Sequence, residues 1–256
     1  MANKSKTIAI VNQKGGVGKS TTAVNLGACL AQAGKRALLI DLDPQGNSTS
    51  GLGMAKGDRE KCIYDALIGD VPISELIESA QTKGLFVVPA TIHLAGAEIE
   101  LVSMISRETR LKQVLELLEE VYNYIIIDCP PSLGLLTVNA LTAADQLIIP
   151  IQCEYYALEG LSKLLESVRL IRKHLNPHLE IAGVLMTMHD ARTKISQQVV
   201  DEVAKYFKDK VYKTIIPRTV RLSEAPSFGQ PITTYDPKCV GAVAYQNFAK
   251  EVIKRG

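Results

Sequence analysis

The chain has 256 residues, of which 46% are hydrophobic and 22% charged, enough apolar material for a full globular core. This composition excludes a disordered chain, and no stretch approaches the roughly 18 apolar residues of a membrane-spanning helix. The net charge is only +2, but the part from residue 190 onward carries 12 Lys and Arg against 7 Asp and Glu. A basic surface is therefore permitted there, although charge runs also simply solvate a protein face.

The N-terminal and cysteine patterns indicate a cytosolic protein. The first apolar run, Thr7–Val11, is shorter than the roughly 7–15 residues of a signal-peptide core. The five cysteines are scattered, without the paired spacing of a disulfide framework or a metal site. We therefore expect a soluble protein in the reducing cytoplasm.

Seven short apolar runs predict β-strands, with helical patterns between them. The runs are Thr7–Val11, Ala37–Asp41, Leu85–Val88, Tyr124–Asp128, Gln146–Pro150, Ile181–Met186 and Val211–Ile216. Most are apolar throughout, as expected for strands that helices cover on both faces. The alternation of strands and helices predicts an α/β fold with one doubly wound, mostly parallel sheet. No linker or repeat interrupts the pattern, so we expect residues 1–256 to form a single domain.

Three helices can be placed by their spacing. Thr22–Ala33 is a good helix that Gly34 closes as its C-terminal cap. Arg110–Val121 and residues 161–171 carry apolar stripes at helical spacing, which we assign to the core. Gly51–Lys61 is the loosest stretch, and we expect it to be a surface loop.

The most informative segment follows the first strand and precedes the first helix. Residues 12–21 read NQKGGVGKST, and strand, glycine-rich turn, Lys-Ser and helix form the context of a phosphate-binding loop. Glycines let backbone N–H groups turn toward phosphate oxygens, and the helix N-terminus adds its positive dipole end. Lys19 is expected to contact the β- and γ-phosphates, and the Ser20 hydroxyl to ligate Mg²⁺. The usual first glycine is replaced by Gln13, and a second lysine, Lys14, lies inside the loop.

Two further segments place carboxylates at strand ends. Residues 41–47 read DLDPQGN, in which an ionised Asp43 could orient or deprotonate a water beside a γ-phosphate. The alternative is turn chemistry, which Asp-x-Asp-Pro also provides. A run of three isoleucines delivers Asp128 to the carboxyl end of its strand, where it would hold Mg²⁺ through a water. Taken alone, that strand could equally be a buried strand followed by a turn, with Cys129 a small core residue.

Together these segments resemble the ParA/Soj family of bacterial partitioning ATPases, within the MinD/ParA group of deviant Walker A proteins. The resemblance runs end to end and includes residues 90–101 and 129–140. Residues 150–160 and 216–226 are similar to the chromosomal Soj type in particular. The resemblance implies a P-loop ATPase that uses ATP and Mg²⁺.

The same resemblance implies a site shared by two protomers. ATP would lie between facing chains, with Lys14 reaching the partner's nucleotide and Gly15 lying where the chains approach closely. Lys14, Lys19 and Asp43 would then be the catalytic residues. The ATP contacts implied are Lys14, Gly15, Gly16, Val17, Gly18, Lys19, Ser20, Thr21, Pro217 and Arg218.

The resemblance further implies that the ATP dimer binds double-stranded DNA without sequence preference and associates with the nucleoid. The matching basic residues are Arg192 and Arg221, for which surface salt bridges are the alternative. A ParB-type partner is expected to accelerate hydrolysis. Basal hydrolysis should be slow, because nothing resembles an arginine finger in cis. A replication initiator is a possible further partner.

Several rival functions are disfavoured by particular features. A MinD-like membrane ATPase needs a lipid-binding C-terminal helix, but the face of Val243–Arg255 is more typical of a helix docked on the core, so we expect no membrane partner. An iron–sulfur carrier would need paired cysteines, and an ATP-dependent synthetase a second-substrate motif. A tyrosine autokinase would cluster its tyrosines at the C-terminus. Residues 187–190, TMHD, lack the lysine of guanine-binding motifs, which disfavours GTP.

Overall fold

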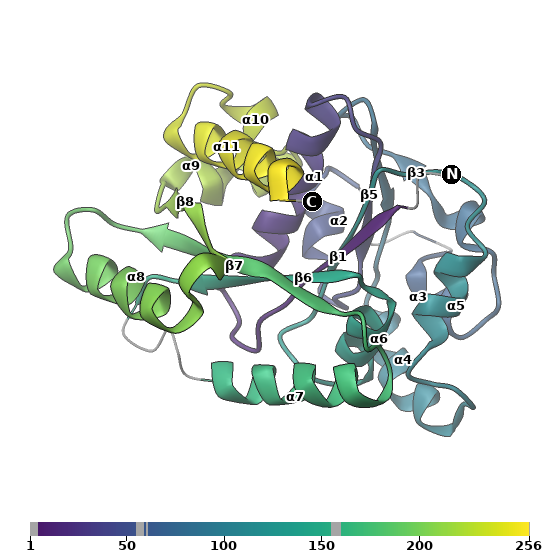
Figure 1. Ribbon diagram of the computed structural model, residues 1–256. Helices are drawn as coiled ribbons and strands as arrows, with labels where there is room; N and C mark the ends of the chain where they lie inside the picture. The colour runs from purple at the N-terminus through teal and green to yellow at the C-terminus, as the bar shows by residue number, and fades with distance from the viewer. Residues whose placement is uncertain (1–4, 55–58, 60, 155–159, 256) are drawn as a thin grey trace.

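The computed structural model describes residues 5–54, 59, 61–154 and 160–255. In this part of the chain, eight strands form one sheet in the order β3-β4-β2-β5-β1-β6-β7-β8 (Figure 1). All neighbours pair in parallel except β3 and β4, which are antiparallel. The strands are β1 Lys6–Ile10, β2 Ala37–Asp41, β3 Glu78–Ser79, β4 Leu85–Val88, β5 Tyr124–Asp128, β6 Gln146–Gln152, β7 Glu180–His189 and β8 Val211–Pro217.

Helices cover both faces of the sheet, so the predicted doubly wound architecture is confirmed. One face packs against α3 to α8, and the other against α1, α10 and α11. The helices are α1 Lys19–Gln32, α2 Asn47–Gly51, α3 Ile63–Leu67, α4 Leu94–Glu100, α5 Arg110–Glu116, α6 Leu135–Ala143, α7 Leu161–His174, α8 Lys194–Phe207, α9 Val220–Glu224, α10 Ile232–Tyr235 and α11 Val240–Arg255. Four short 3₁₀ turns among the described residues are η1 Ile73–Leu76, η2 Leu101–Ser103, η3 Lys208–Lys210 and η4 Ala225–Phe228.

All seven predicted strands are confirmed, and their ends differ from the prediction by at most three residues. The sequence analysis missed β3, which has only two residues and pairs at the sheet edge with Phe86 and Val87. A pairing this short leaves no periodic pattern in the sequence, because alternation needs about four residues to be visible.

Two predicted helix ends need correction. Gly34 has φ +79° just beyond α1, as expected for a C-terminal glycine, but α1 begins at Lys19, three residues before the prediction. Helix α5 ends at Glu116 rather than Val121, because the Leu118 amide bonds the Leu115 carbonyl (3.2 Å) in a tighter turn toward β5.

The predicted surface loop Gly51–Lys61 is wrong at its start, since Gly51 closes α2 and Leu52 is buried. Residues 55–58 and 60 of that loop lie outside the described residues, as do residues 155–159 of the Soj-like segment 150–160.

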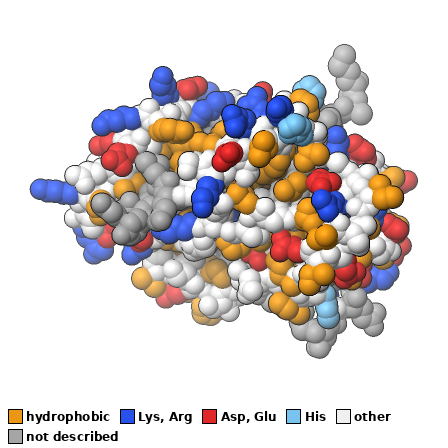
Figure 2. Space-filling view, turned by 90° about the horizontal axis from the view of Figure 1, so that it is seen from below, with side chains coloured by type: hydrophobic (Ala, Val, Ile, Leu, Met, Phe, Trp, Pro, Cys, Tyr) orange, Lys and Arg blue, Asp and Glu red, His pale blue; other side chains and the backbone are white. Residues whose placement is uncertain are grey.

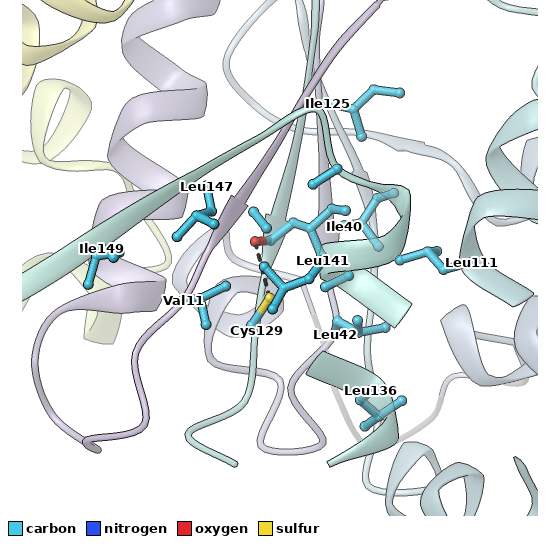
Figure 3. Packing of buried hydrophobic residues seen from close by; sticks show 14 of the residues in the cluster. Val11, Ile40, Leu42, Leu111, Ile125, Cys129, Leu136, Leu141, Leu147 and Ile149 are labelled. Atoms are coloured by element: carbon cyan, nitrogen blue, oxygen red, sulfur yellow. Dashed lines mark hydrogen bonds between the residues drawn. The ribbon is translucent and has the colours of Figure 1, made fainter. Parts of the chain in front are cut away.

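Cys129 is a core residue, as the sequence suggested. It is fully buried beyond β5 and lies in Figure 3 among Val11, Leu42 and Leu141. Its thiol donates to the Ile127 carbonyl (3.8 Å), and burial raises its pKa well above the ordinary value. A thiol kept protonated in this way is a poor nucleophile, so Cys129 is a packing residue.

The C-terminal helix α11 docks on the core. Tyr245, Phe248 and Val252 are buried, and the Phe248 ring meets Tyr212 of β8 edge to face, with 4.9 Å between the centroids. The apolar face of α11 is therefore covered by protein. Within the described residues, no helix is both long and apolar enough to cross a membrane.

Candidate functional site

Two adjoining cavities lie at the carboxyl end of the sheet, where ligands bind in open α/β folds. The first has a volume of about 430 Å³ and is lined by the glycine-rich loop, Asp43 and η4. The second has a volume of about 560 Å³ and is lined by the ends of β7 and β8 with α9. Gly18, Thr21 and Met188 border both cavities, so one extended ligand can occupy the two together.

The glycine-rich loop is held from both sides. Gly16 and Gly18 adopt left-handed backbone conformations (φ +72° and +89°), which only glycine reaches without strain. The Asn12 side chain donates to the Pro150 carbonyl (2.7 Å) and accepts from the Lys14 amide (3.0 Å). The Val17 carbonyl accepts from the Thr187 hydroxyl (2.9 Å). The loop is therefore held in this shape by hydrogen bonds within the chain.

Lys19 is buried inside this loop. Only 6% of its surface is exposed, and its ammonium donates to the Lys14 carbonyl (3.1 Å). Burial lowers the pKa of Lys19, while the nearby charges of Asp128 and Asp43 oppose that shift. Lys14 is half-buried, and Gly15 beside it is exposed. A buried cation beside a glycine-rich loop and a helix N-terminus is well suited to bind a phosphate anion.

Asp128 ends β5 and is fully buried. Its Oδ2 accepts from the Ser48 hydroxyl (2.7 Å), whereas its Oδ1 has no hydrogen-bond partner in the described part of the chain. Burial raises the pKa of Asp128 to about 7, the charge of Asp41 adds to this, and the Ser20 and Ser48 hydroxyls oppose it. This buried carboxylate oxygen has an unused lone pair and lies close to a serine hydroxyl. Oxygen atoms of these two kinds are the ligands that Mg²⁺ prefers.

The two aspartates of the Asp-x-Asp segment have different surroundings. Asp41 is fully buried, and its Oδ2 accepts from both the amide and the hydroxyl of Thr49 (2.7 Å each). Burial raises its pKa to about 6. Asp43 lines the first cavity and also caps a turn, since its carboxylate accepts from the Gln45 amide (2.9 Å). Asp43 can thus cap the turn and face the cavity at the same time. The contacts of Asp41 are structural, because both of its bonds to Thr49 are within the fold.

The second cavity brings together residues far apart in sequence. Pro217 and Arg218 line it, as does Tyr245, whose hydroxyl bonds that of Thr22 on α1 (3.2 Å). The Arg218 guanidinium also pairs with Glu154 (2.7 Å). Met188 has a left-handed backbone (φ +52°), rare for a residue with a side chain, which turns it into the border of both cavities.

Several site residues were missed by the sequence analysis. They are Asn12, Ser48, Met188 and Tyr245. Asn12 lies within the glycine-rich segment and Ser48 directly follows the Asp-x-Asp segment, but a single amide or hydroxyl side chain carries no periodic signal. Met188 and Tyr245 come from distant strands and helices, so only the tertiary fold brings them to the site.

The two predicted DNA-binding arginines lie on the surface and are already in ion pairs. The Arg192 side chain is 88% exposed and meets Asp190 through two bonds (2.9 and 2.7 Å), which hold the pKa of Asp190 well below its ordinary value. Arg221 pairs with Glu224 (3.1 Å) and Asp236 (3.4 Å). On the face in Figure 2, Lys and Arg side chains project from the α8 end, whereas hydrophobic side chains gather toward α4 and α6.

The matches to known proteins extend over most of the chain. A family model described as an AAA domain matches residues 5–181. The sporulation initiation inhibitor protein Soj of Bacillus subtilis is 65% identical over 98% of this chain and 99% of its own length. The chromosome-partitioning ATPase Soj of Treponema pallidum is 52% identical over 98% of both chains. A solved structure, cobyrinic acid a,c-diamide synthase from Mycobacterium smegmatis with ADP and magnesium, is 38% identical, covers 98% of this chain and 94% of its own, and superposes with a TM-score of 0.87.

Proposed function

This chain belongs to the Soj/ParA family of chromosome-partitioning ATPases, and we propose that it is an ATP-driven switch for partitioning DNA. ATP binding brings two copies together and creates a surface for non-specific double-stranded DNA. Hydrolysis, accelerated by a ParB-type partner, separates the copies and releases the DNA. This cycle would place the protein on the nucleoid in the cytoplasm.

The two cavities divide the nucleotide between them. The phosphates occupy the first cavity, where Lys19 and the backbone N–H groups of residues 15–21 neutralise their charge. The base and ribose extend into the second cavity toward Pro217 and Arg218. The apolar part of this cavity's lining suits a flat base.

Ser20 and Asp128 would hold Mg²⁺, which supplies charge neutralisation at the β- and γ-phosphates. The structures that support this pairing of nucleotide and metal include the magnesium- and ADP-bound synthase, whose fold this chain shares. The unpartnered Oδ1 of Asp128 is the oxygen available for that role.

Hydrolysis depends on Asp43 and on two lysines. Asp43 lies in the phosphate cavity, where its carboxylate can orient the attacking water and accept its proton. Lys19 stabilises the charge that develops on the phosphate within the same chain, and Lys14 does so from the partner. Because the last cation comes from a second copy, the isolated chain hydrolyses ATP slowly.

Gly15 supports the two-copy arrangement through what surrounds it. A Cβ added at Gly15 meets nothing within 4 Å, so the single chain has no need of glycine there. A larger residue should therefore be tolerated in the monomer and clash only with a partner. Gly15→Val is expected to keep nucleotide binding and lose dimerisation.

Arg192 and Arg221 would supply the DNA contacts. Their ion pairs are exposed, and exposed pairs contribute little to stability, so DNA phosphates can replace the acidic partners readily. A dimer doubles the number of phosphate contacts. Since affinity grows with each contact, DNA binding becomes dependent on ATP.

The observation that carries this proposal is the buried Lys19 beneath the glycine-rich loop, near Asp43 and the buried, unpartnered Oδ1 of Asp128. The test is double-stranded DNA binding at low salt with ATP, with ADP and without nucleotide. We expect tight binding only with ATP, prolonged by Asp43→Ala and lost in Arg192→Glu.

Lys112→Glu on α5, at the opposite end of the sheet from α8, is the matched charge reversal and should bind like the native chain. Equal DNA binding in all nucleotide states, or none, would remove the partitioning function. The remaining candidates would then be lipid binding and a synthetase reaction like that named for the 38% identical structure.

A further inference from the structure

Two consecutive hydroxyls at the start of α2 hold two neighbouring strand ends. Ser48 donates to Asp128 Oδ2 (2.7 Å), and Thr49 donates to Asp41 Oδ2 (2.7 Å). Asp41 and Asp128 are direct neighbours in the register of β2 and β5. Both hydroxyl-bearing residues and both carboxylates have no exposed surface. Helix α2 is thus hydrogen-bonded to the carboxyl ends of two neighbouring strands.

The hydrogen bond from Ser48 uses only one oxygen of Asp128. The other, Oδ1, is buried without a partner in the described part of the chain. An ionised carboxylate has about four lone-pair sites, and leaving a buried oxygen without a hydrogen bond is unfavourable unless a ligand completes it. Because Ser48 fixes Oδ2, the carboxylate cannot turn freely, and Oδ1 keeps one direction.

We propose that Ser48 is a positioning residue for the metal site: it anchors Oδ2 of Asp128 so that Oδ1 faces the metal. The inference rests on the proposed function, because it assumes that Asp128 holds Mg²⁺ beside ATP. Partners of this kind orient metal-binding groups in other proteins, and their loss typically weakens metal binding by about 10–100-fold.

The hydrogen bond from Ser48 also links Asp128 to the segment that carries Asp43. Asp43 lies five residues before Ser48, and Gln45 and Asn47 between them line the phosphate cavity. A change in the orientation of Asp128 therefore reaches this segment through one hydrogen bond. Thr49 anchors α2 independently, through Asp41 and the Ala90 amide (3.0 Å), so α2 should stay in place when the Ser48 hydroxyl is removed.

The test measures the affinity for a fluorescent ATP analogue with EDTA and across a Mg²⁺ titration. The native chain should bind more tightly as Mg²⁺ is added. Ser48→Ala should match the native affinity in EDTA, but need about 10-fold more Mg²⁺ for half of the tightening. Ser48→Cys fills the same volume with a weaker donor and should shift in the same direction, which covers the case that alanine unfolds.

Thr49→Val is the matched control, because it removes the neighbouring hydroxyl from a carboxylate that we do not assign to the metal. It should lower the melting temperature and leave the Mg²⁺ midpoint unchanged. An Asp128→Asn background supplies the second control. If Ser48 acts through Asp128, Ser48→Ala should cause no further shift in that background, because coupled residues are non-additive.

Three results would overturn the inference: an unchanged Mg²⁺ midpoint in Ser48→Ala, an equal loss of affinity in EDTA, or a full effect in the Asp128→Asn background. A native chain whose nucleotide affinity ignores Mg²⁺ would instead overturn the proposed metal site, and this inference with it. The native titration therefore separates the two failures.

Discussion

The phosphate cavity and the basic surface both present positive charge, but they differ in burial and in what their charges contact. Lys19 is 6% exposed and faces an open cavity beside Asp43 and Asp128. Arg192 and Arg221 are exposed and each already meets a carboxylate. Under the proposed function, the cavity takes the phosphates of the nucleotide, whereas each arginine exchanges its carboxylate for a DNA phosphate.

This difference teaches which substitutions matter most. Removing a buried charge changes the free energy of ligand binding several times more than removing an exposed one. Water does not screen the buried charge, and its geometry is fixed. An exposed ion pair contributes little to stability and exchanges partners readily. Substitutions in the cavity should therefore abolish single steps of the cycle, while those on the surface should shift affinities by modest factors.

The largest effect is expected at Lys19. Lys19→Ala removes the buried ammonium from the phosphate site, and we expect ATP hydrolysis to fall by about 10³-fold, as for the loss of a preorganised charge donor. Phosphate release at saturating ATP, with nucleotide binding measured alongside, is the readout. Hydrolysis within a few-fold of native would mean that the cavity is not the catalytic site.

Asp43→Ala should separate binding from chemistry within the cavity. The carboxylate can orient and deprotonate water, so we expect hydrolysis to fall by about 10²–10⁴-fold while ATP affinity stays near native. Single-turnover hydrolysis measures the first and equilibrium binding the second. Asp43→Asn keeps the bond from the Gln45 amide and serves as control, because it distinguishes the turn from the chemistry. Recovery of activity in Asp43→Asn would assign Asp43 to the turn alone.

On the surface, the sharpest pair of variants is Arg192→Ala and Asp190→Asn. The first removes a phosphate contact, and the second releases Arg192 from the carboxylate that holds it. We expect DNA affinity to fall about 10-fold in Arg192→Ala, with a shallower salt dependence, and to rise a few-fold in Asp190→Asn. Fluorescence anisotropy at several salt concentrations tests both. Changes in DNA affinity of opposite sign in the two variants would support the DNA role of Arg192. If neither variant changed the affinity, the Arg192–Asp190 pair would be only a surface salt bridge.

The smallest effect is on stability as a function of pH. Burial raises the pKa of Asp41 to about 6 and that of Asp128 to about 7, above the ordinary value of about 3.9. The folded protein therefore binds more protons than the unfolded chain in this window, and this contribution to stability is lost as pH rises from about 4 to about 7. Urea unfolding without nucleotide measures the free energy of unfolding at each pH. Its decrease between about pH 4 and pH 7 should be smaller in Asp128→Asn than in the native chain, by about 1 kcal/mol or more. An identical pH dependence in the two proteins would contradict the raised pKa.

The sequence predicted the features that depend on neighbours along the chain. Seven strands, the glycine-rich loop and the positions of Lys19, Asp43 and Asp128 at the carboxyl edge follow from apolar runs and from their order. A parallel sheet explains this success, because the carboxyl end of every parallel strand faces the same edge. The family resemblance then predicted the nucleotide and the partners.

Only the tertiary structure decided which groups meet. Ser48 contacts Asp128 across 80 positions of sequence, Thr187 bonds the loop from 170 positions away, and Met188 turns into the cavity through a strained backbone. The early end of α5 and the two-residue β3 were decided in the same way, by packing rather than by local preference. Hydrogen bonds and carboxylate orientation depend on distances below 3 Å, and such distances are set when the helices close over the sheet, not by any pattern along the chain.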